Sequence, residues 1–217
     1  MSSVPKEKMT YLAQSFEQPI LQKRQGLDWA DAGHTHHHNH EHQDYGFTQD
    51  FHVWLDPTYA MEMVKIIQRE ASLRQPQFAE QFAQNSALML SKLKALDVQI
   101  QSQLRDVKEK GYWVFHDAYQ YFEKRYDMKA QGAIRLEPNV SPSVKRVREI
   151  QRQLQTHNST CIFAEPQFSR RMVGSLVRGT QVRSGVLDPL GGSIAAGREQ
   201  YFELMQTMAN SLKRCLQ

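Results

Sequence analysis

The chain has 217 residues, a formal net charge of +4 and 40% hydrophobic residues, with a pI near 9.0. This length allows one large domain or two small ones with a true core. No apolar run approaches the ~18 residues of a membrane span, and no apolar signal segment opens the chain. Lys and Arg are scattered and not gathered in a stripe with aromatics, so we expect no nucleic-acid binding.

The N-terminal part of the chain contains a dense histidine cluster. Residues 1–33 are polar, with helix and loop signals, and are too short to bury a core of their own. The next stretch has no hydrophobic periodicity, which predicts a loop. It contains six histidines: His34, His36, His37, His38, His40 and His42. A seventh, His52, lies apart in "FHVWLDP", an apolar, strand-like run that ends at Pro57.

Two helices are predicted next. Asp56 followed by Pro57 is the pattern of an N-cap with proline at the first helical position, and "TYAMEMVKIIQREASL" then has helical spacing. A longer helix is predicted over residues 77–108, where apolar side chains recur at three- and four-residue steps. At 1.5 Å per residue it would span roughly 45 Å. A helix of that length either joins two lobes or forms one arm of a bundle.

Beyond Gly111 strands and helices alternate. The strands are predicted at "YWVF", "AQGAIRL", "CIFAE" and "QVRSGVL". The helices are predicted at "HDAYQYFEKRY", "SPSVKRVREIQRQLQ", "FSRRMVGSLVRG" and "REQYFELMQTMANSLKRCL". Four strands alternating with four helices predict an α/β lobe with a parallel sheet.

Polar side chains follow three of the predicted strands. In open parallel sheets, ligands bind beyond the carboxyl ends of the strands, and these ends carry His116, Glu165 and Asp188. We interpret Glu165 as a helix cap or the partner of a buried amide, and leave Asp188 open between that role and a functional one. His116, paired across a cleft with His52, would give two zinc ligands, and one carboxylate would still leave a coordination position open.

The two cysteines, Cys161 and Cys215, do not form a CxxC pair, which excludes a zinc ribbon and a thioredoxin-type motif. Two readings stay open at this point. They are two unrelated buried thiols, or they form a disulfide that ties the C-terminal helix to a strand. In the chain-entropy model such a bridge would stabilise the fold by about 4 kcal/mol. It would also imply an oxidising compartment.

Five motifs occur together in a characteristic order: "FHVWLDP", "VFHDAYQYFEKRY", "GAIRLEPNVSPS", "CIFAEPQFS" and "LDPLGG". With the histidine-rich stretch and the cysteines, they closely resemble the periplasmic zinc-binding proteins of bacterial ABC zinc importers, the ZnuA family of solute-binding proteins. The resemblance covers the chain from about the histidine-rich loop to its end.

This resemblance implies an α/β fold of two lobes joined by a long rigid helix. The expected division is a partial N-terminal lobe at 1–76, a linking helix at 77–108 and a four-stranded parallel α/β lobe at 109–217. The chain is expected to depart from the family pattern at its start. It would begin partway through the first lobe, without a signal peptide and without that lobe's own histidine ligand.

The family's function implies a binding protein and not an enzyme. Zn²⁺ would be captured between the lobes in the periplasm and delivered to an ABC permease and its ATPase, with the protein acting as a monomer. By position, His52 and His116 would be zinc ligands. Asp188 matches a carboxylate ligand of manganese-binding relatives, Cys161 and Cys215 match a disulfide of zinc-specific members, and the loop histidines would collect zinc weakly.

Three alternatives compete with a working zinc receptor. One is a zinc hydrolase that uses His52, His116 and Asp188 around a metal-bound water with Glu165 as base, although the chain has no HExxH and no nucleophile elbow. Another is a metal buffer that acts through residues 34–42 alone. The third is a truncated fragment with an incomplete site. A rigid site should bind more tightly than the loop, because ordering a loop costs about 1–2 kcal/mol per residue.

Overall fold

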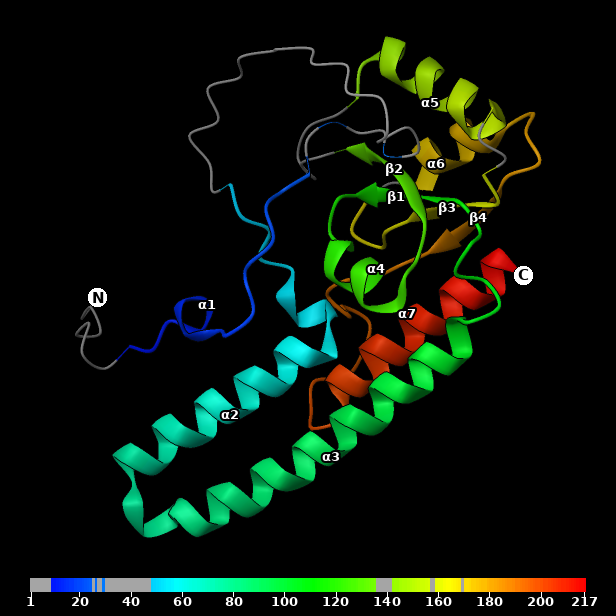
Figure 1. The fold of residues 1–217 in the computed structure, drawn as a ribbon. Helices are drawn as coiled ribbons and strands as arrows, with labels where there is room; N and C mark the ends of the chain where they lie inside the picture. Colours follow the sequence, from blue (N-terminus) through cyan, green and yellow to red (C-terminus); the bar gives the residue numbers. More distant parts are fainter. Residues whose placement is uncertain are drawn as a thin grey trace.

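The computed structural model describes residues 9–24, 26, 29, 48–135, 142–156, 159–168 and 170–217. An α/β lobe forms one end of the molecule, and a hairpin of two long helices projects away from it (Figure 1). The described N-terminal residues 9–24 contact the first helix of the hairpin and then reach the lobe, where Leu21 and Gln22 bond to the side chains of Tyr121 and Gln120. Within the described residues, no helix combines the length and the apolar character that crossing a membrane requires.

The lobe is built on a four-stranded parallel sheet. Its strands are β1 (Tyr112–His116), β2 (Ala130–Arg135), β3 (Cys161–Ala164) and β4 (Arg183–Val186), in the order β2-β1-β3-β4. The helices that follow them are α4 (Gln120–Tyr126), α5 (Val144–Thr156), α6 (Arg170–Val177) and α7 (Gln200–Leu216). The predicted alternation and the parallel sheet are therefore confirmed.

Both faces of the sheet are buried, as parallel sheets require. Side chains alternate along β1, so Tyr112 and Val114 face one layer while Trp113 and Phe115 face the other. The first layer packs against α3 and α7, and the second against α5 and α6. This explains why "YWVF" is a continuous apolar run and not an alternating one.

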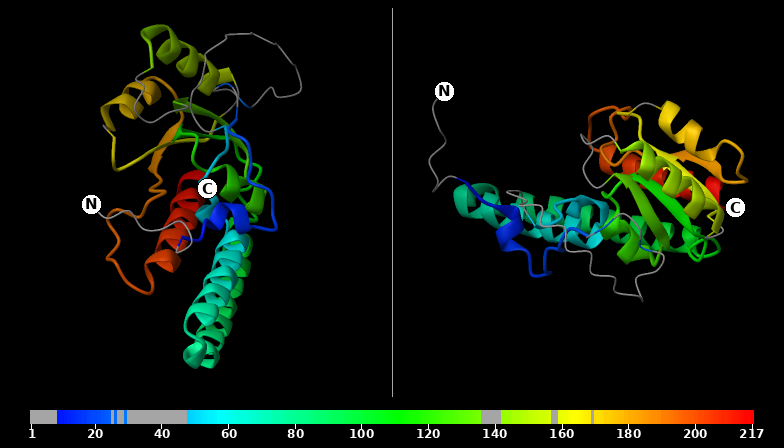
Figure 2. Two further views of the ribbon diagram at one scale, coloured as in Figure 1. Left: turned by 90° about the vertical axis from the view of Figure 1, so that its left-hand side faces the viewer. Right: turned by 90° about the horizontal axis from the view of Figure 1, so that it is seen from above.

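The helical hairpin consists of α2 (Pro57–Arg74) and α3 (Ala79–Leu104), joined by the 3₁₀ turn η3 (Pro76–Phe78). The two helices lie side by side, and the far end of α3 packs along α7 (Figures 1 and 2). The predicted helix over 77–108 is therefore shortened at both ends, by η3 and by turns after Leu104. In this structure α3 is an arm of the hairpin and also reaches into the lobe.

The start of α2 has the predicted cap. The Asp56 carboxylate accepts hydrogen bonds from the Thr58 amide at 2.7 Å and from the Thr58 hydroxyl at 2.8 Å, and Pro57 occupies the first turn. The run before it is not a strand, which corrects the strand-like interpretation of "FHVWLDP". Val53–Leu55 form the 3₁₀ turn η2, because this geometry buries Val53 against Tyr59 and Tyr121 and sends Leu55 into the lobe core.

Cys161 and Cys215 form a disulfide that joins β3 to α7. The neighbouring strand approaches this bridge closely at Gly185. A Cβ at Gly185 would lie 2.5 Å from a Phe163 ring carbon and 3.3 Å from the Cys215 sulfur. Glycine at this position therefore allows β4 to pack over the bridge.

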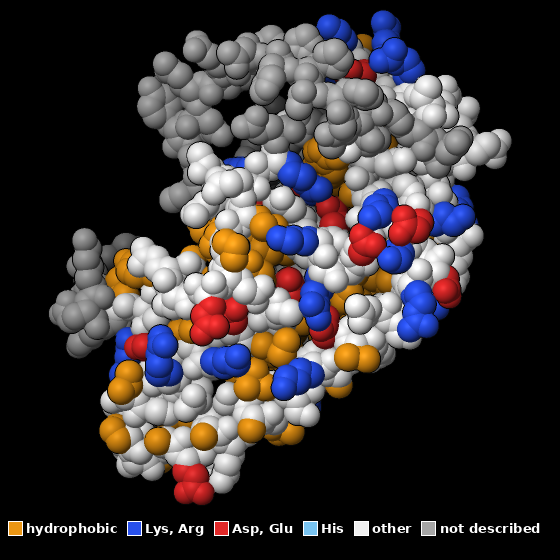
Figure 3. All heavy atoms as spheres, viewed as in Figure 1, with side chains coloured by type: hydrophobic (Ala, Val, Ile, Leu, Met, Phe, Trp, Pro, Cys, Tyr) orange, Lys and Arg blue, Asp and Glu red, His pale blue; other side chains and the backbone are white. Residues whose placement is uncertain are grey.

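The hairpin exposes several large apolar side chains. They lie on both helices and at the tip: Ile67, Leu73, Phe78, Leu88 and Val98. Figure 3 shows hydrophobic side chains distributed over this part of the surface, between charged ones. The exposed apolar side chains lie in that part of the hairpin where α2 and α3 pack mainly against each other.

Candidate metal centre

The structure brings the two predicted histidine ligands together. His52 precedes η2 and His116 ends β1, and their ring centroids lie 5.6 Å apart. Two imidazoles that share one tetrahedral zinc, at Zn–N distances of about 2.0–2.1 Å, place their ring centroids roughly 5 Å apart. The His52 side chain is 29% exposed and that of His116 is 11% exposed, so the pair lies at the edge of the core.

The ring of His52 is held by a buried carboxylate. Its Nδ1 lies 2.6 Å from Asp50 Oδ1, and its backbone amide donates to the same oxygen at 3.0 Å. The other oxygen, Asp50 Oδ2, accepts from Gln120 Nε2 at 3.0 Å. Burial would raise the pKa of Asp50, but the hydrogen bonds from His52 and Gln120 outweigh it and hold that pKa below its usual value.

The ring of His116 has an equivalent partner. Its Nδ1 lies 2.6 Å from Glu165 Oε1 and 2.8 Å from Oε2, and the Tyr119 hydroxyl donates to Oε1 at 3.1 Å. Glu165 is 2% exposed. Burial, with the Glu165 carboxylate beside it, raises the pKa of Tyr119 well above its usual value, so this hydroxyl remains a donor at neutral pH.

Glu165 therefore does more than the cap or amide partner predicted for it. It also accepts a 3.4 Å hydrogen bond from the His116 backbone amide, but its main partner is the ring. A signal for this existed in the sequence. Strands β1 and β3 are neighbours in the sheet, so the side chains that end them meet at the same edge.

Both histidines use the same nitrogen, Nδ1, to contact a carboxylate. A carboxylate on Nδ1 favours the proton at that position, which leaves the Nε2 lone pair free to bind a metal. Acidic partners of this kind also orient the ring and increase its basicity. Two such nitrogens on rigid elements make a partial coordination shell suited to zinc.

Asp188 lies beyond the same end of the sheet, but its oxygens are already used. Oδ1 accepts from Gln167 Nε2 at 2.8 Å and from the Leu190 amide at 3.1 Å, and Oδ2 accepts from the Gly192 amide at 2.8 Å. It therefore organises the loop after β4. That loop contacts the His52 segment, because Trp54 Nε1 donates to the Pro189 carbonyl at 2.9 Å. Its role as a metal ligand stays a prediction.

Within the described part of the chain, no three His, Cys, Asp or Glu side chains converge as a complete metal site. The histidine-rich stretch lies outside the described residues: His34, His36, His37, His38, His40 and His42. The prediction that these side chains bind metal weakly therefore stays a prediction.

A buried charge cluster lies beside His116. Arg24 donates through Nε to Asp117 at 3.0 Å, through Nη2 also to Asp117, and through Nη1 to Glu123 at 2.6 Å, and it stacks 3.5 Å from the ring centre of Trp29. Burial raises the pKa of Glu123 to about 7, although Arg24 lowers it. The role of Arg24 was not predictable from the sequence, because 93 residues separate it from Asp117.

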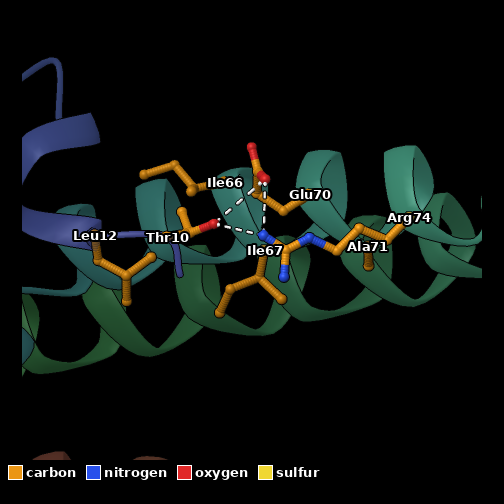
Figure 4. A pocket seen from close by; sticks show the side chains of 7 residues that line it. All are labelled: Thr10, Leu12, Ile66, Ile67, Glu70, Ala71 and Arg74. Atoms are coloured by element: carbon orange, nitrogen blue, oxygen red, sulfur yellow. Dashed lines mark hydrogen bonds and ion pairs between the residues drawn. The ribbon is translucent and has the colours of Figure 1, made fainter. Parts of the chain in front are cut away.

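A shallow hollow of about 360 Å³ lies elsewhere, between the N-terminal segment and α2. Figure 4 shows its floor of Leu12, Ile66 and Ile67 and its polar edge, where Glu70 contacts Thr10 and Arg74. Its lining has one carboxylate and no histidine, so it lacks the ligands of a metal site. The histidine pair remains the candidate centre.

The sequence from residue 5 to residue 215 matches the profile of the family described as "ZnuA: Zinc-uptake complex component A periplasmic". The chain belongs to the ZnuA family. The family description is that of a periplasmic transport component and not of an enzyme. The recognition made from the five motifs is confirmed.

Relatives of known function support this membership. The chain is 41% identical over 167 residues to the "High-affinity zinc uptake system protein ZnuA" of Brucella abortus, an alignment that covers 77% of this chain and 50% of that protein. It thus spans about half the length of the curated ZnuA proteins it matches.

Solved ZnuA structures share the fold. One crystal structure of ZnuA superposes with a TM-score of 0.74 at 19% identity, covering 97% of this chain and 72% of that one. A ZnuA deletion mutant with zinc bound superposes with a TM-score of 0.65 at 22% identity, covering 78% and 62%. The predicted α/β fold with a four-stranded parallel lobe, of the kind found in these solute-binding proteins, is thereby confirmed.

Proposed function

We propose that this chain captures Zn²⁺ as the solute-binding component of an ABC zinc importer, with His52 and His116 as ligands. The observation that carries the proposal is the paired geometry of the two rings. Each Nδ1 is held by a carboxylate buried to 97% or more, and the ring centroids are 5.6 Å apart. Membership of the ZnuA family supports zinc as the cargo.

The partners follow from the same proposal. The chain would act in the periplasm, as a monomer, and would pass Zn²⁺ to a membrane permease driven by an ATPase. The division into a partial lobe at 1–76, a linking helix at 77–108 and a lobe at 109–217 fits this role, because each of the two outer parts then contributes one histidine of the pair. Asp188 is proposed as an additional oxygen ligand. To bind the metal, it would have to give up hydrogen bonds that its carboxylate now accepts from Gln167 and the loop after β4.

The test is a zinc titration against a chromophoric chelator, on the unchanged chain and on a form without residues 34–42. We expect one tight site that survives the deletion and is weakened at least 100-fold by His52→Ala or His116→Ala. Asp188→Asn tests the additional ligand and is expected to weaken zinc less than either histidine variant. Thermal unfolding of each variant controls for loss of fold.

A second candidate function is a metal buffer that acts through the histidine-rich stretch. It is favoured by the density of six histidines within residues 34–42. It predicts several weak sites that all disappear with the deletion and that are indifferent to His116→Ala. That outcome would contradict the proposal that the histidine pair is the functional site and would fit a receptor with an incomplete cleft.

A further inference from the structure

We propose that Gln120, at the start of α4, is a positioning residue that fixes the ring of His52 for zinc. This inference rests on the proposed function, because it concerns how one proposed ligand is oriented. Gln120 does not contact the histidine. It acts through Asp50, whose Oδ2 accepts from Gln120 Nε2 at 3.0 Å while Oδ1 holds His52 Nδ1 at 2.6 Å.

The residue before it serves the other histidine in the same way. Tyr119 donates to Glu165 at 3.1 Å, and Glu165 holds His116 Nδ1. Tyr119 and Gln120 are thus adjacent residues at the start of α4, and each donates a hydrogen bond to a carboxylate that holds the Nδ1 of one histidine. Both ligands are oriented from the α/β lobe, although His52 itself belongs to the segment before α2.

Further contacts from α4 fix the segment that carries Asp50. Gln120 Nε2 also donates to the Gln22 carbonyl at 3.0 Å. The hydroxyl of Tyr121, a residue 1% exposed, donates to the Asp50 carbonyl and accepts from the Leu21 amide, both at 2.8 Å. The isolated bridge between Gln22 and Gln49 joins the two backbone segments that α4 binds. Asp50 is thus held at its backbone and at its side chain by consecutive residues of one helix.

The chemistry of the glutamine side chain explains why it suits this place. Its amide nitrogen donates to a carboxylate, which keeps Asp50 Oδ1 directed at His52. The substitution Gln120→Glu keeps the shape of the side chain but replaces the donor with a carboxylate that repels Asp50. Asp50 would then turn away, and the His52 ring would lose the partner that defines its tautomer and orientation.

The experiment measures two quantities on the full chain, with Zn²⁺ as the only ligand. The first is zinc affinity by chelator competition, for the unchanged chain, Gln120→Glu and Gln120→Met. Loss of an outer partner of a metal-binding histidine costs 10- to 100-fold in affinity; we expect a loss of that size for Gln120→Glu and a smaller one for Gln120→Met. Gln103→Glu on α3 is the matched control, since Gln103 bonds only to Asn210 and Gln206 among the contacts identified for it.

The second quantity is the tautomer of each histidine ring without metal, read from the nitrogen chemical shifts in long-range ¹H–¹⁵N NMR spectra. We expect Nδ1–H at both rings in the unchanged chain, and a shift at His52 but not at His116 in Gln120→Glu. A variant that had only lost stability would change the nitrogen chemical shifts of both rings or of neither.

The outcomes separate this inference from the proposed function. If the unchanged chain does not bind zinc tightly, the proposed function fails, but the His52 shift in Gln120→Glu still supports the positioning role. If zinc binds and Gln120→Glu changes neither affinity nor the His52 spectrum, the inference is overturned. A loss of affinity with an unchanged His52 ring overturns it equally, because the effect would then travel by another route.

Discussion

The two histidines of the candidate centre come from unlike places in the chain but have the same chemical surroundings. His52 precedes a 3₁₀ turn and His116 ends a strand, yet each ring nitrogen Nδ1 lies 2.6 Å from a buried carboxylate oxygen. This repetition supports the proposal that the carboxylates belong to the candidate centre. A buried carboxylate without such a partner would be costly to keep ionised.

The substitution Glu165→Gln tests this at His116. The amide can either accept from Nδ1 or donate to it, so the tautomer of the ring is no longer fixed. We expect zinc affinity to fall by about 10- to 100-fold, measured by competition with a chelator. Glu149→Gln, on the surface of α5 with its side chain 40% exposed, should leave the affinity unchanged; an equal loss in both variants would contradict the argument.

The buried Glu123 predicts how stability depends on pH. Burial raises its pKa in the folded protein to about 7, above the value of about 4.3 in an unfolded chain. The folded state therefore binds the proton more tightly, so this contribution to stability is complete below about pH 4 and is lost as the pH rises through 7. Between pH 5 and pH 8 we expect the free energy of unfolding to fall by about 1–3 kcal/mol.

Urea denaturation at several pH values measures this fall, and Glu123→Gln should flatten it. Only the slope with pH is diagnostic, because the variant also loses its ion pair with Arg24 and changes the absolute stability. A slope that is the same in Glu123→Gln and in the unchanged chain would show that another group is responsible.

At the scale of elements, the residues before α2 connect a helix cap to a histidine of the candidate centre. Asp56 ends η2 through its backbone amide, which donates to the Val53 carbonyl, and caps α2 through its side chain. His52 lies at the other end of η2. The turn and the helix start are thus fixed together. A disturbance at Asp56 should reach the candidate centre through only the three residues of this 3₁₀ turn.

We therefore expect Asp56→Ala to lower the free energy of unfolding by about 1 kcal/mol, the usual cost of a lost N-cap. It should also weaken zinc binding slightly, by loosening η2. Asp56→Asn keeps an oxygen acceptor for the Thr58 amide and should be close to the unchanged chain in both respects. Equal destabilisation by Ala and Asn would show that charge and not capping is what Asp56 contributes.

Most of the elements were predictable from the sequence because their signals are local. Apolar runs of four or five residues between helical patterns locate the strands, and Asp56–Pro57 locates the start of α2. The turn η2 was not predictable from "FHVWLDP", since its shape depends on Tyr59 and Tyr121 packing on Val53. A short apolar run contains no information about such distant neighbours.

The candidate site was only half predictable for the same reason. His52 and His116 carry signals as histidines beside apolar runs, and the family motifs pointed to them. Their partners come from elsewhere: 49 residues separate Glu165 from His116, and 70 separate Gln120 from Asp50. Asp50 is only two residues from His52, but nothing in the sequence distinguishes it from an ordinary surface aspartate.

At the scale of the whole molecule, the disulfide links two parts of the α/β lobe that are far apart in the sequence. Cys161 and Cys215 are 54 residues apart and join a central strand to the last described helix. The chain-entropy model gives about 4 kcal/mol for a loop of this size. We expect reduction, or the double substitution Cys161→Ser and Cys215→Ser, to lower the free energy of unfolding by that order.

Chemical denaturation with and without reductant measures this difference. The double variant is the control for the reductant, because its stability should not respond to reducing agent. If reduction leaves the unfolding midpoint of the unchanged chain where it was, the bridge does not contribute to the stability of the lobe in solution.

The hairpin projects from the lobe as a long, stiff arm (Figure 1). Helix α3 contains 26 residues, so at 1.5 Å per residue it is a stiff rod of about 39 Å. One end is embedded beside α7 and the other ends at η3, far from the lobe (Figure 1). A tilt of about 5° at the embedded end would therefore carry the tip through roughly 3 Å. A small rotation of the lobe would thus appear as a larger displacement of the hairpin tip, which a fluorescent or spin label at Gln77 would measure.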